Sequence, residues 1–376
     1  MVQAQNTSLP FGKPSIKETN LSQTQFRVGI VGCGLIADKL DDSPILAPGR
    51  LDLPWTHAPA YHMVPDTKIV AVSDVNEKAM AEFAKRWEIP ATYSDYRKMF
   101  DQENLDIVSV LAPNFLHCEM TIAAAEAGVG VVFCEVPMSS SLEEADQMIE
   151  ACRKTGTQLV VDVGSGRWWA REYMNAKEII DTGGIGDIVT MITSITSGLV
   201  LNGTSMLDML RFFAGSDVRE VFGWLYDMPG PESEYIDRGA TAFLRFENGI
   251  EAIFNGQDGK PFAEWDIMGT EGRIRIGNNV LELWKSNKDS PSREMLSHPF
   301  PQRYAAKAAR VAIIEKFVAH LRGDEEGDIS NGADGRAAME IALAIYESHD
   351  TGGWIKLPLT KSHHQVNVLH GPRAWE

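Results

Sequence analysis

A glycine-containing turn directly after an apolar run constrains this chain more than any other feature of its sequence. The motif VGIVGCGLIA occupies residues 28–37, with an alanine at its third small position. Gly32 permits a tight turn after a buried strand, and Gly34 lets the backbone approach a pyrophosphate. The N–H groups of the next helical turn, which starts at Leu35 and Ile36, then face the negative charge. Because the motif follows a strand and opens a series of strands and helices, it predicts a dinucleotide-binding site.

Buried strands alternate with helices through the first part of the chain, which predicts a parallel, doubly wound α/β sheet. Further strands are expected at 67–74, 105–113, 129–137 and 157–164, with helices between them. Their continuous apolar runs are typical of parallel strands that are covered on both faces. We therefore expect a Rossmann domain over residues 26–164, preceded by a polar extension over residues 1–25.

The pattern changes after about residue 165, where apolar and polar residues begin to alternate. Strands of this kind are expected at 187–196 and at 240–256, where an Asn-Gly pair at 248–249 marks a hairpin turn. Two helices follow near the end of this part of the chain. We expect an α+β domain with an antiparallel sheet over residues 165–360, followed by a polar tail over residues 361–376.

The second expected strand ends in a carboxylate, Asp74, which indicates the identity of the dinucleotide. A carboxylate at this position accepts hydrogen bonds from the ribose hydroxyls and would repel a 2′-phosphate. No arginine or lysine follows directly, so we expect NAD. Asp74 lies 42 positions after Gly32 because a Pro/Gly-rich insertion at 41–56 separates the turn from HAPAYHMVP. Two interpretations of the insertion stay open: a lid or subunit contact, and a loop without a role.

The strand expected at 105–113 ends in Ala112, Pro113 and Asn114. Ligands of open α/β sheets bind beyond the carboxyl edges of the strands, so we expect these three residues to line the cofactor site. His117 follows in the first turn of the next helix. For His117 a contact with the cofactor and a helix cap both stay open.

The net charge of −17 excludes nucleic acids and anionic membranes as partners, because both require concentrated positive charge. The four cysteines are scattered without a CxxC pair, which is typical of a reducing cytoplasm. The N-terminus lacks the apolar core of a signal peptide, and no apolar run reaches the roughly 18 residues of a membrane span. No HExxH motif, calcium loop or Cys/His cluster appears, so we expect no metal site.

Several stretches together resemble the glucose–fructose oxidoreductase/inositol dehydrogenase (Gfo/Idh/MocA) superfamily. The resemblance runs from about residue 26 to 359 and rests on GIVGCGLIA, HAPAY, Asp74, APNFLH, EVP, AKEIIDTGGIGDI, LDMLRFFAG, GTEGRIRI and ALAIYESHDTGGWIKLPL. It implies a Rossmann domain followed by an open antiparallel sheet, through which the subunits of a dimer or tetramer pair. It also implies NAD(P)-dependent oxidation or reduction at one alcohol or aldehyde carbon of a sugar or cyclitol.

The sequence departs from this family where its members handle protons. The family usually has Glu-Lys-Pro where this chain has Glu135-Val136-Pro137. An ammonium group there assists the movement of a proton while hydride leaves carbon, and valine cannot do so. A second family motif, Asp-x-x-x-His, corresponds to Leu201 and Ser205 in this chain. The three usual proton-handling groups are therefore absent, while the glycine turn is intact.

The resemblance implies that other groups near these positions carry the proton chemistry. Ser205, or a water molecule beside it, is the expected relay, with Arg167 or Glu135 assisting. Glu135 is also expected at the rim of the nicotinamide site.

Substrate contacts are expected from residues around the same two positions. Asn202 and Asp208 lie in the stretch that matches the second family motif. The stretch GSGRWW at 164–169 adds Trp168 and Trp169, whose flat rings suit a polyhydroxylated ligand. For these two tryptophans, packing between the domains stays open as an alternative.

Three functions remain compatible with the sequence. The first is an NAD-dependent oxidoreductase that acts on a sugar, sugar derivative or cyclitol with relocated acid/base groups. The second is an NAD-dependent glycosidase or lyase, because superfamily members that oxidise, eliminate, add water and reduce again can carry Glu-Val-Pro. The third is a non-catalytic protein that binds NAD or a sugar. We favour the first, as a cytoplasmic homo-oligomer.

Overall fold

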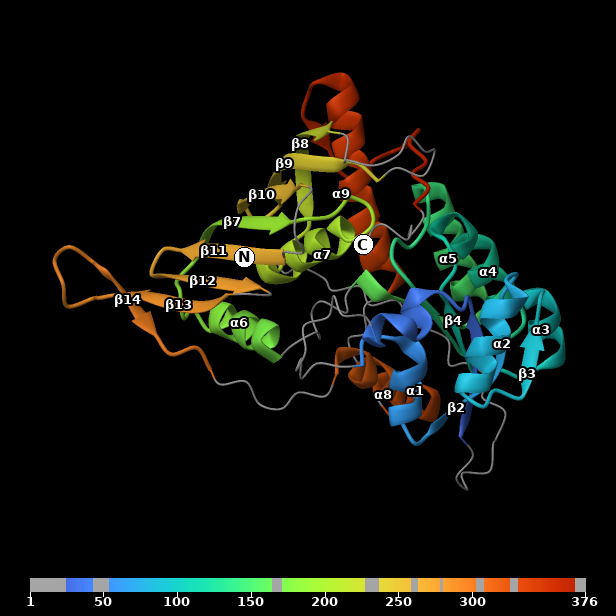
Figure 1. Cartoon of the computed structure of the whole chain (residues 1–376). Helices are drawn as coiled ribbons and strands as arrows, with labels where there is room; N and C mark the ends of the chain where they lie inside the picture. Colours follow the sequence, from blue (N-terminus) through green and yellow to red (C-terminus); the bar gives the residue numbers. More distant parts are fainter. Residues whose placement is uncertain are drawn as a thin grey trace.

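Six parallel strands form the first of two sheets in the computed structural model (Figure 1). The structure describes residues 25–42, 54–163, 171–226, 237–257, 263–277, 280–301, 308–324 and 331–368. The strands are β1 (Phe26–Val31), β2 (Thr67–Ser73), β3 (Ala91–Tyr93), β4 (Ile107–Val110), β5 (Val131–Cys134) and β6 (Gln158–Val161). Their order is β3-β2-β1-β4-β5-β6, so the direction of winding reverses between β1 and β4. This confirms the doubly wound sheet, to which the short β3 is an unexpected addition.

Helices cover both faces of this sheet, which is why every residue of β4 and β5 is buried. They include α2 (Glu77–Arg86), α3 (Tyr96–Gln102), α4 (Asn114–Glu126) and α5 (Leu142–Thr155). Local signals set the ends of these helices. The side chains of Asn76 and Ser141 accept backbone N–H groups at the starts of α2 and α5, and Gly156 ends α5 in the left-handed conformation.

The helix expected directly after the glycine turn is absent from that position, and this expectation was wrong. Two short 3₁₀ turns follow instead, η1 (Leu35–Ala37) and η2 (Lys39–Asp42), and the helix α1 (His57–Met63) begins only after the insertion. Asp41 holds the base of the insertion, because its carboxylate accepts the N–H of Trp55 at 2.9 Å and the hydroxyl of Thr56 at 2.5 Å. The role of the insertion stays open, since residues 43–53 lie outside the described residues.

Within the described residues, the second sheet has nine strands in the order β14-β13-β12-β11-β7-β10-β9-β8-β15. They are β7 (Ile188–Ile195), β8 (Val218–Tyr226), β9 (Gly239–Phe246), β10 (Glu251–Gly256), β11 (Ala263–Gly269), β12 (Gly272–Gly277), β13 (Leu281–Ser286), β14 (Met295–His298) and β15 (Ile355–Lys356). The expected hairpin joins β9 to β10. The sheet is mixed and mostly antiparallel, because β10 pairs in parallel with β7.

Helices α6 (Arg171–Asp181), α7 (Gly203–Ala214) and α9 (Gly332–Thr351) pack against the second sheet (Figure 1). Large apolar side chains of the same sheet also remain partly exposed, among them Trp224, Phe243 and Trp354. They lie close together through Phe222, whose ring centroid is 6.4 Å from that of Trp224 and 5.7 Å from that of Trp354. The second sheet therefore presents an apolar patch of its own to the surroundings.

Two segments from the end of the chain return to the first sheet. Helix α8 (Ala309–Arg322) packs there, with Ile314 and Phe317 in one apolar cluster with Ile30 and Phe133. After α9 and β15 the chain runs back again, and Val366 and Val368 are buried. Residues 361–368 of the expected polar tail are thus partly packed, and residues 369–376 lie outside the described residues. No helix of the described ranges is long and apolar enough to span a bilayer.

Candidate active site

The glycine turn has the geometry that a bound pyrophosphate requires. Gly32 has a φ of +103°, and a Cβ built on it would lie 2.9 Å from the backbone carbonyl of Leu111. Only glycine fits this turn without strain. A Cβ on Gly34 would meet nothing within 4 Å, so open space lies above the backbone there. Leu35 beside it is exposed and Ile36 is half-buried. These residues fit the phosphate end of a dinucleotide.

Asp74 is fixed against this turn at the end of β2. Its Oδ2 accepts the N–H of Cys33 at 2.6 Å, and its Oδ1 accepts the N–H of Asn76 at 2.7 Å. The carboxylate therefore lies beside the glycine loop, where a ribose would follow a bound pyrophosphate. The geometry fits NAD, and direct contact between Asp74 and the ribose stays a prediction.

His117 joins the loop after β4 to the loop after β5. Its Nδ1 lies 2.9 Å from the carbonyl oxygen of Pro137, and its Nε2 lies 2.6 Å from that of Ala112. Burial lowers the pKa of His117, although both carbonyls favour the charged ring. The side chain thus binds the two loops together, and a cofactor contact of His117 remains untested, as do those of Ala112 and Pro113.

Asn114 is committed to protein partners in a similar way. Its Nδ2 donates to the carbonyl oxygens of Ser139 at 3.0 Å and Val366 at 2.8 Å. Its Oδ1 accepts the N–H of Val368 at 2.8 Å. The side chain is 2% exposed. Whether Asn114 also reaches the cofactor stays a prediction, but its amide is occupied by the end of the chain.

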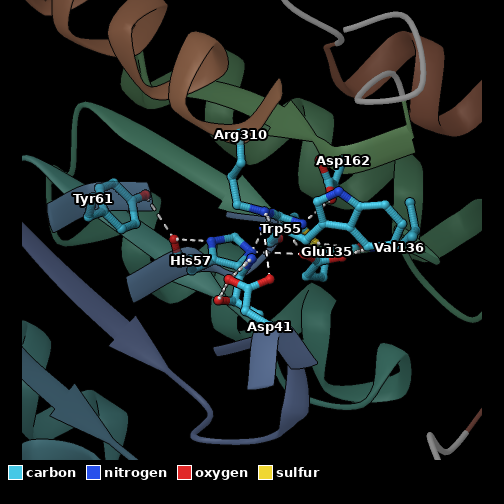
Figure 2. A network of polar contacts seen from close by, with 11 residues as sticks. Asp41, Trp55, His57, Tyr61, Glu135, Val136, Asp162 and Arg310 are labelled. Atoms are coloured by element: carbon cyan, nitrogen blue, oxygen red, sulfur yellow. Dashed lines mark hydrogen bonds and ion pairs between the residues drawn. The ribbon is translucent and has the colours of Figure 1, made fainter. Parts of the chain in front are cut away.

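A buried polar network at the carboxyl ends of β5 and β6 was not expected from the sequence (Figure 2). Arg310, at the start of α8, lies at its centre. Its Nη1 is 3.0 Å from Glu135 Oε1 and 2.6 Å from His57 Nε2, and its Nη2 donates to Asp162 Oδ2 at 2.8 Å. Its Nε donates to the carbonyl oxygen of Trp55. One guanidinium thus holds two carboxylates, a histidine and the end of the insertion.

The histidine of this network is neutral. Burial, and then the charge of Arg310, hold the pKa of His57 well below its usual range. Its Nε2 faces both a donor, Arg310 Nη1 at 2.6 Å, and an acceptor, Glu135 Oε1 at 2.8 Å, while its Nδ1 lies 3.1 Å from Ser109 Oγ. Ser109 Oγ in turn lies 2.8 Å from the hydroxyl of Tyr61. Since Tyr61 is buried, this chain of groups ends in the interior.

Glu135 is the member of the network that borders Val136. Its side chain is 10% exposed, whereas that of His57 is fully buried. The ion pair with Arg310 fixes the position of this carboxylate at the carboxyl edge of β5. The sequence contained one signal for this arrangement: Arg310 stands alone within the apolar stretch AARVAII. An arginine in such a stretch is rarely buried without a partner.

On the side of the second sheet, the start of α7 carries the predicted substrate residues. Ser205 and Asp208 are buried. Asp208 Oδ1 lies 3.3 Å from Arg211 Nη1, so its charge is compensated within the protein. Asn202 donates from Nδ2 to Ser197 Oγ at 2.8 Å. Their roles stay predictions, and Arg167, Trp168 and Trp169 lie outside the described residues.

A further carboxylate, Asp237, lies near the start of α7, and the sequence did not identify it as a site residue. Its two oxygens accept the N–H groups of Val200 at 2.9 Å and Leu201 at 2.7 Å. Burial raises the pKa of Asp237 to about 6, although the two N–H groups lower it. Asp237 therefore places an acid/base group beside Leu201, although the two residues are far apart in the sequence.

Among the described residues, no group of His, Cys, Asp or Glu side chains could hold a metal ion.

Comparison with protein families settles the ancestry of both halves. Residues 26–163 match the oxidoreductase family with an NAD-binding Rossmann fold (GFO_IDH_MocA), and residues 193–357 match the C-terminal alpha/beta domain of the same family. The chain belongs to the Gfo/Idh/MocA oxidoreductase family. The NAD-binding domain predicted from the glycine turn is thereby confirmed.

Members of this family with assigned names align with nearly the whole chain. Myo-inositol 2-dehydrogenase of Thermotoga maritima is 27% identical over 355 residues, which cover 88% of this chain and 98% of the relative. Levoglucosan dehydrogenase of Pseudarthrobacter phenanthrenivorans is 27% identical over 393 residues, with 88% and 98% covered.

Solved structures agree in fold. The WlbA dehydrogenase of Bordetella pertussis, in complex with NADH and UDP-GlcNAcA, superposes with a TM-score of 0.71 at 22% identity, covering 89% of this chain and 99% of that one. A levoglucosan dehydrogenase in complex with NADH and levoglucosan gives 0.70 at 23% identity, covering 89% and 100%.

Proposed function

We propose that this chain is an NAD-dependent oxidoreductase that moves hydride between the nicotinamide and a secondary alcohol carbon of a sugar, sugar derivative or cyclitol. The observation that carries this proposal is the alignment of both domains with named sugar and cyclitol dehydrogenases over 98% of their length. The geometry of the glycine turn and the position of Asp74 support NAD as the cofactor.

The residues of the first sheet bind and orient the cofactor. Gly32 and Gly34 leave room for the pyrophosphate, and Asp74 is placed to accept hydrogen bonds from the ribose. NAD, when bound, supplies the hydride acceptor of the reaction. The chain itself must then remove the proton of the substrate hydroxyl, and Val136 has no group for this task.

Two carboxylates of the described residues are candidates for the proton acceptor. Glu135 lies next to Val136, but its Oε1 is occupied by Arg310 Nη1 at 3.0 Å and by His57 Nε2 at 2.8 Å. Asp237 lies beside Leu201 and has a pKa of about 6, which is closer to the pH at which a general base works best. We favour Asp237 as the base, with Ser205 as relay and Glu135 as an orienting group.

The proposal is tested by incubating the purified chain with NAD and a panel that includes myo-inositol, levoglucosan and simple glycosides. Formation of NADH from a free sugar or cyclitol supports the oxidoreductase. Cleavage of a glycoside without net NADH supports the second candidate, an NAD-dependent glycosidase, which Val136 in the Glu-Val-Pro motif favours. Binding of NADH and sugar with no turnover of any compound contradicts both.

Two further expectations concern the assembly and the location of the protein. The apolar patch around Trp224, Phe243 and Trp354 supports pairing of two copies through the second sheet. If light scattering gives the molar mass of one chain, this pairing is contradicted. All four cysteines are free and buried, which supports a reducing cytoplasm and is checked by fractionation of the source cells.

A further inference from the structure

The end of the chain is built into the carboxyl edge of the first sheet. After β15 the chain crosses from the second sheet to the starts of α4 and α5, where the red segment in Figure 1 approaches the green α5. Val366 donates its N–H to the carbonyl oxygen of Ser140 at 2.9 Å, and Gln365 Nε2 donates to Ser140 Oγ at 3.1 Å. We call residues 365–368 the C-terminal strap.

Asn114 binds the strap as a neighbouring strand would. Its amide donates to the carbonyl of Val366 and accepts from the N–H of Val368, so it pairs with two residues spaced as in a ladder. The third contact of this amide goes to the carbonyl of Ser139. One side chain therefore joins the loop after β4, the loop after β5 and the strap.

Apolar packing holds the strap in the same place. Val366 is 6% exposed and Val368 is 3% exposed, and both belong to the apolar cluster against which Val136 packs. Burial of two valine side chains and pairing of the Asn114 amide both stabilise the strap in one position. The strap therefore has a defined binding position on the first domain.

The position of the strap is next to the predicted nicotinamide site. In a doubly wound sheet a dinucleotide lies beyond the carboxyl ends of the strands on both sides of the reversal point, which places its second half over β4 and β5. Asn114 begins α4, four residues after the end of β4, and Ser139 lies three residues after Val136. His117 also contacts both loops, through the carbonyl oxygens of Pro137 and Ala112.

We propose that the C-terminal strap positions the loops after β4 and β5 for cofactor binding, and that Asn114 acts through the strap. Asn114 and the strap are positioning elements in this scheme. Without the strap, Ser140 loses two hydrogen bonds, and Asn114 loses the two bonds that join it to Val366 and Val368. The loops then adopt the binding geometry for a smaller fraction of the time, and the apparent Kd for the cofactor rises in proportion.

The test compares four forms of the full protein by titration with NADH, followed by its fluorescence. One chain ends after His364 and lacks the strap, and the matched control ends after Val368 and keeps it. The third form carries Asn114→Ala, and the fourth combines Asn114→Ala with the shorter truncation point. If removal of the strap leaves the loops competent about a tenth of the time, the Kd for NADH rises about tenfold. The control should bind as the full chain does.

The combined form decides whether Asn114 acts through the strap. If it does, Asn114→Ala weakens binding in the full chain and costs much less once the strap is gone, when only its bond to Ser139 remains to be lost. Fully additive losses would mean that Asn114 acts independently of the strap and would overturn the proposal. Unchanged NADH affinity in the truncated chain, even with a lower melting temperature, would also overturn it, because a purely structural role predicts that result.

The titration needs no sugar, so its outcome is independent of the oxidoreductase activity on which the proposed function rests. Where a substrate is found, the KM for NAD should rise more than kcat falls. Asn114→Gln, which keeps the amide, should recover part of the affinity that Asn114→Ala loses.

Discussion

Replacing Arg310 with methionine should cost about 3–5 kcal/mol of folding free energy, since removing one partner of a buried ion pair leaves uncompensated charge. Arg310 is 8% exposed and holds Glu135 and Asp162 at 3.0 and 2.8 Å. Methionine fills a similar volume, so the loss reports the charge and its hydrogen bonds more than packing. Arg310→Lys keeps the charge but cannot reach all four partners, and we expect a loss of about 1–3 kcal/mol.

The assay is urea denaturation followed by tryptophan fluorescence, with NADH affinity measured on the same samples. Arg322→Met is the matched control, because Arg322 lies on the same helix and pairs with Asp66 at 2.6 Å at the surface. An exposed pair contributes at most about 1 kcal/mol. Adding Glu135→Gln and Asp162→Asn to Arg310→Met should restore part of the stability, because the uncompensated charges are removed together. The reasoning is refuted if Arg310→Met loses no more stability than Arg322→Met.

Three further predictions follow from the geometry. Asp74→Ala should weaken NAD binding much more than NADP binding, and equal losses in parallel titrations would count against NAD as the cofactor. Because the pKa of buried His57 is lowered, the unfolded state takes up more protons below pH about 6.5, so stability should fall from pH 7 to pH 5. His57→Gln should flatten that slope in melting experiments across pH, and an unchanged slope would contradict a neutral His57. Asp237→Asn should remove the fall in stability that the raised pKa of Asp237 causes as the pH rises from about 4 to about 7, although it costs one of the two bonds from the N–H groups of Val200 and Leu201. It should also lower kcat about 10²–10⁴-fold; full activity would remove Asp237 from the mechanism.

The features that the sequence predicted correctly are local ones. The glycine turn, the carboxylate that ends β2 and the hairpin between β9 and β10 each depend on residues within a few positions of one another. The apolar runs that define the first sheet are also readable in short windows. The NAD-binding fold was therefore predictable from the sequence.

The tertiary structure decided the features that depend on distant residues. Arg310 and His57 are 253 positions apart, and Asn114 and Val366 are 252 apart, so no local pattern could join them. The position of α8 on the first sheet depended on which surface its apolar residues, such as Ile314 and Phe317, could cover. After the glycine turn, Asp41 closes the insertion by binding Trp55 and Thr56 from across 14 and 15 positions, and the next α-helix begins only at His57. Short-range pattern thus determined the cofactor fold, while long-range packing decided which side chains surround the reacting groups.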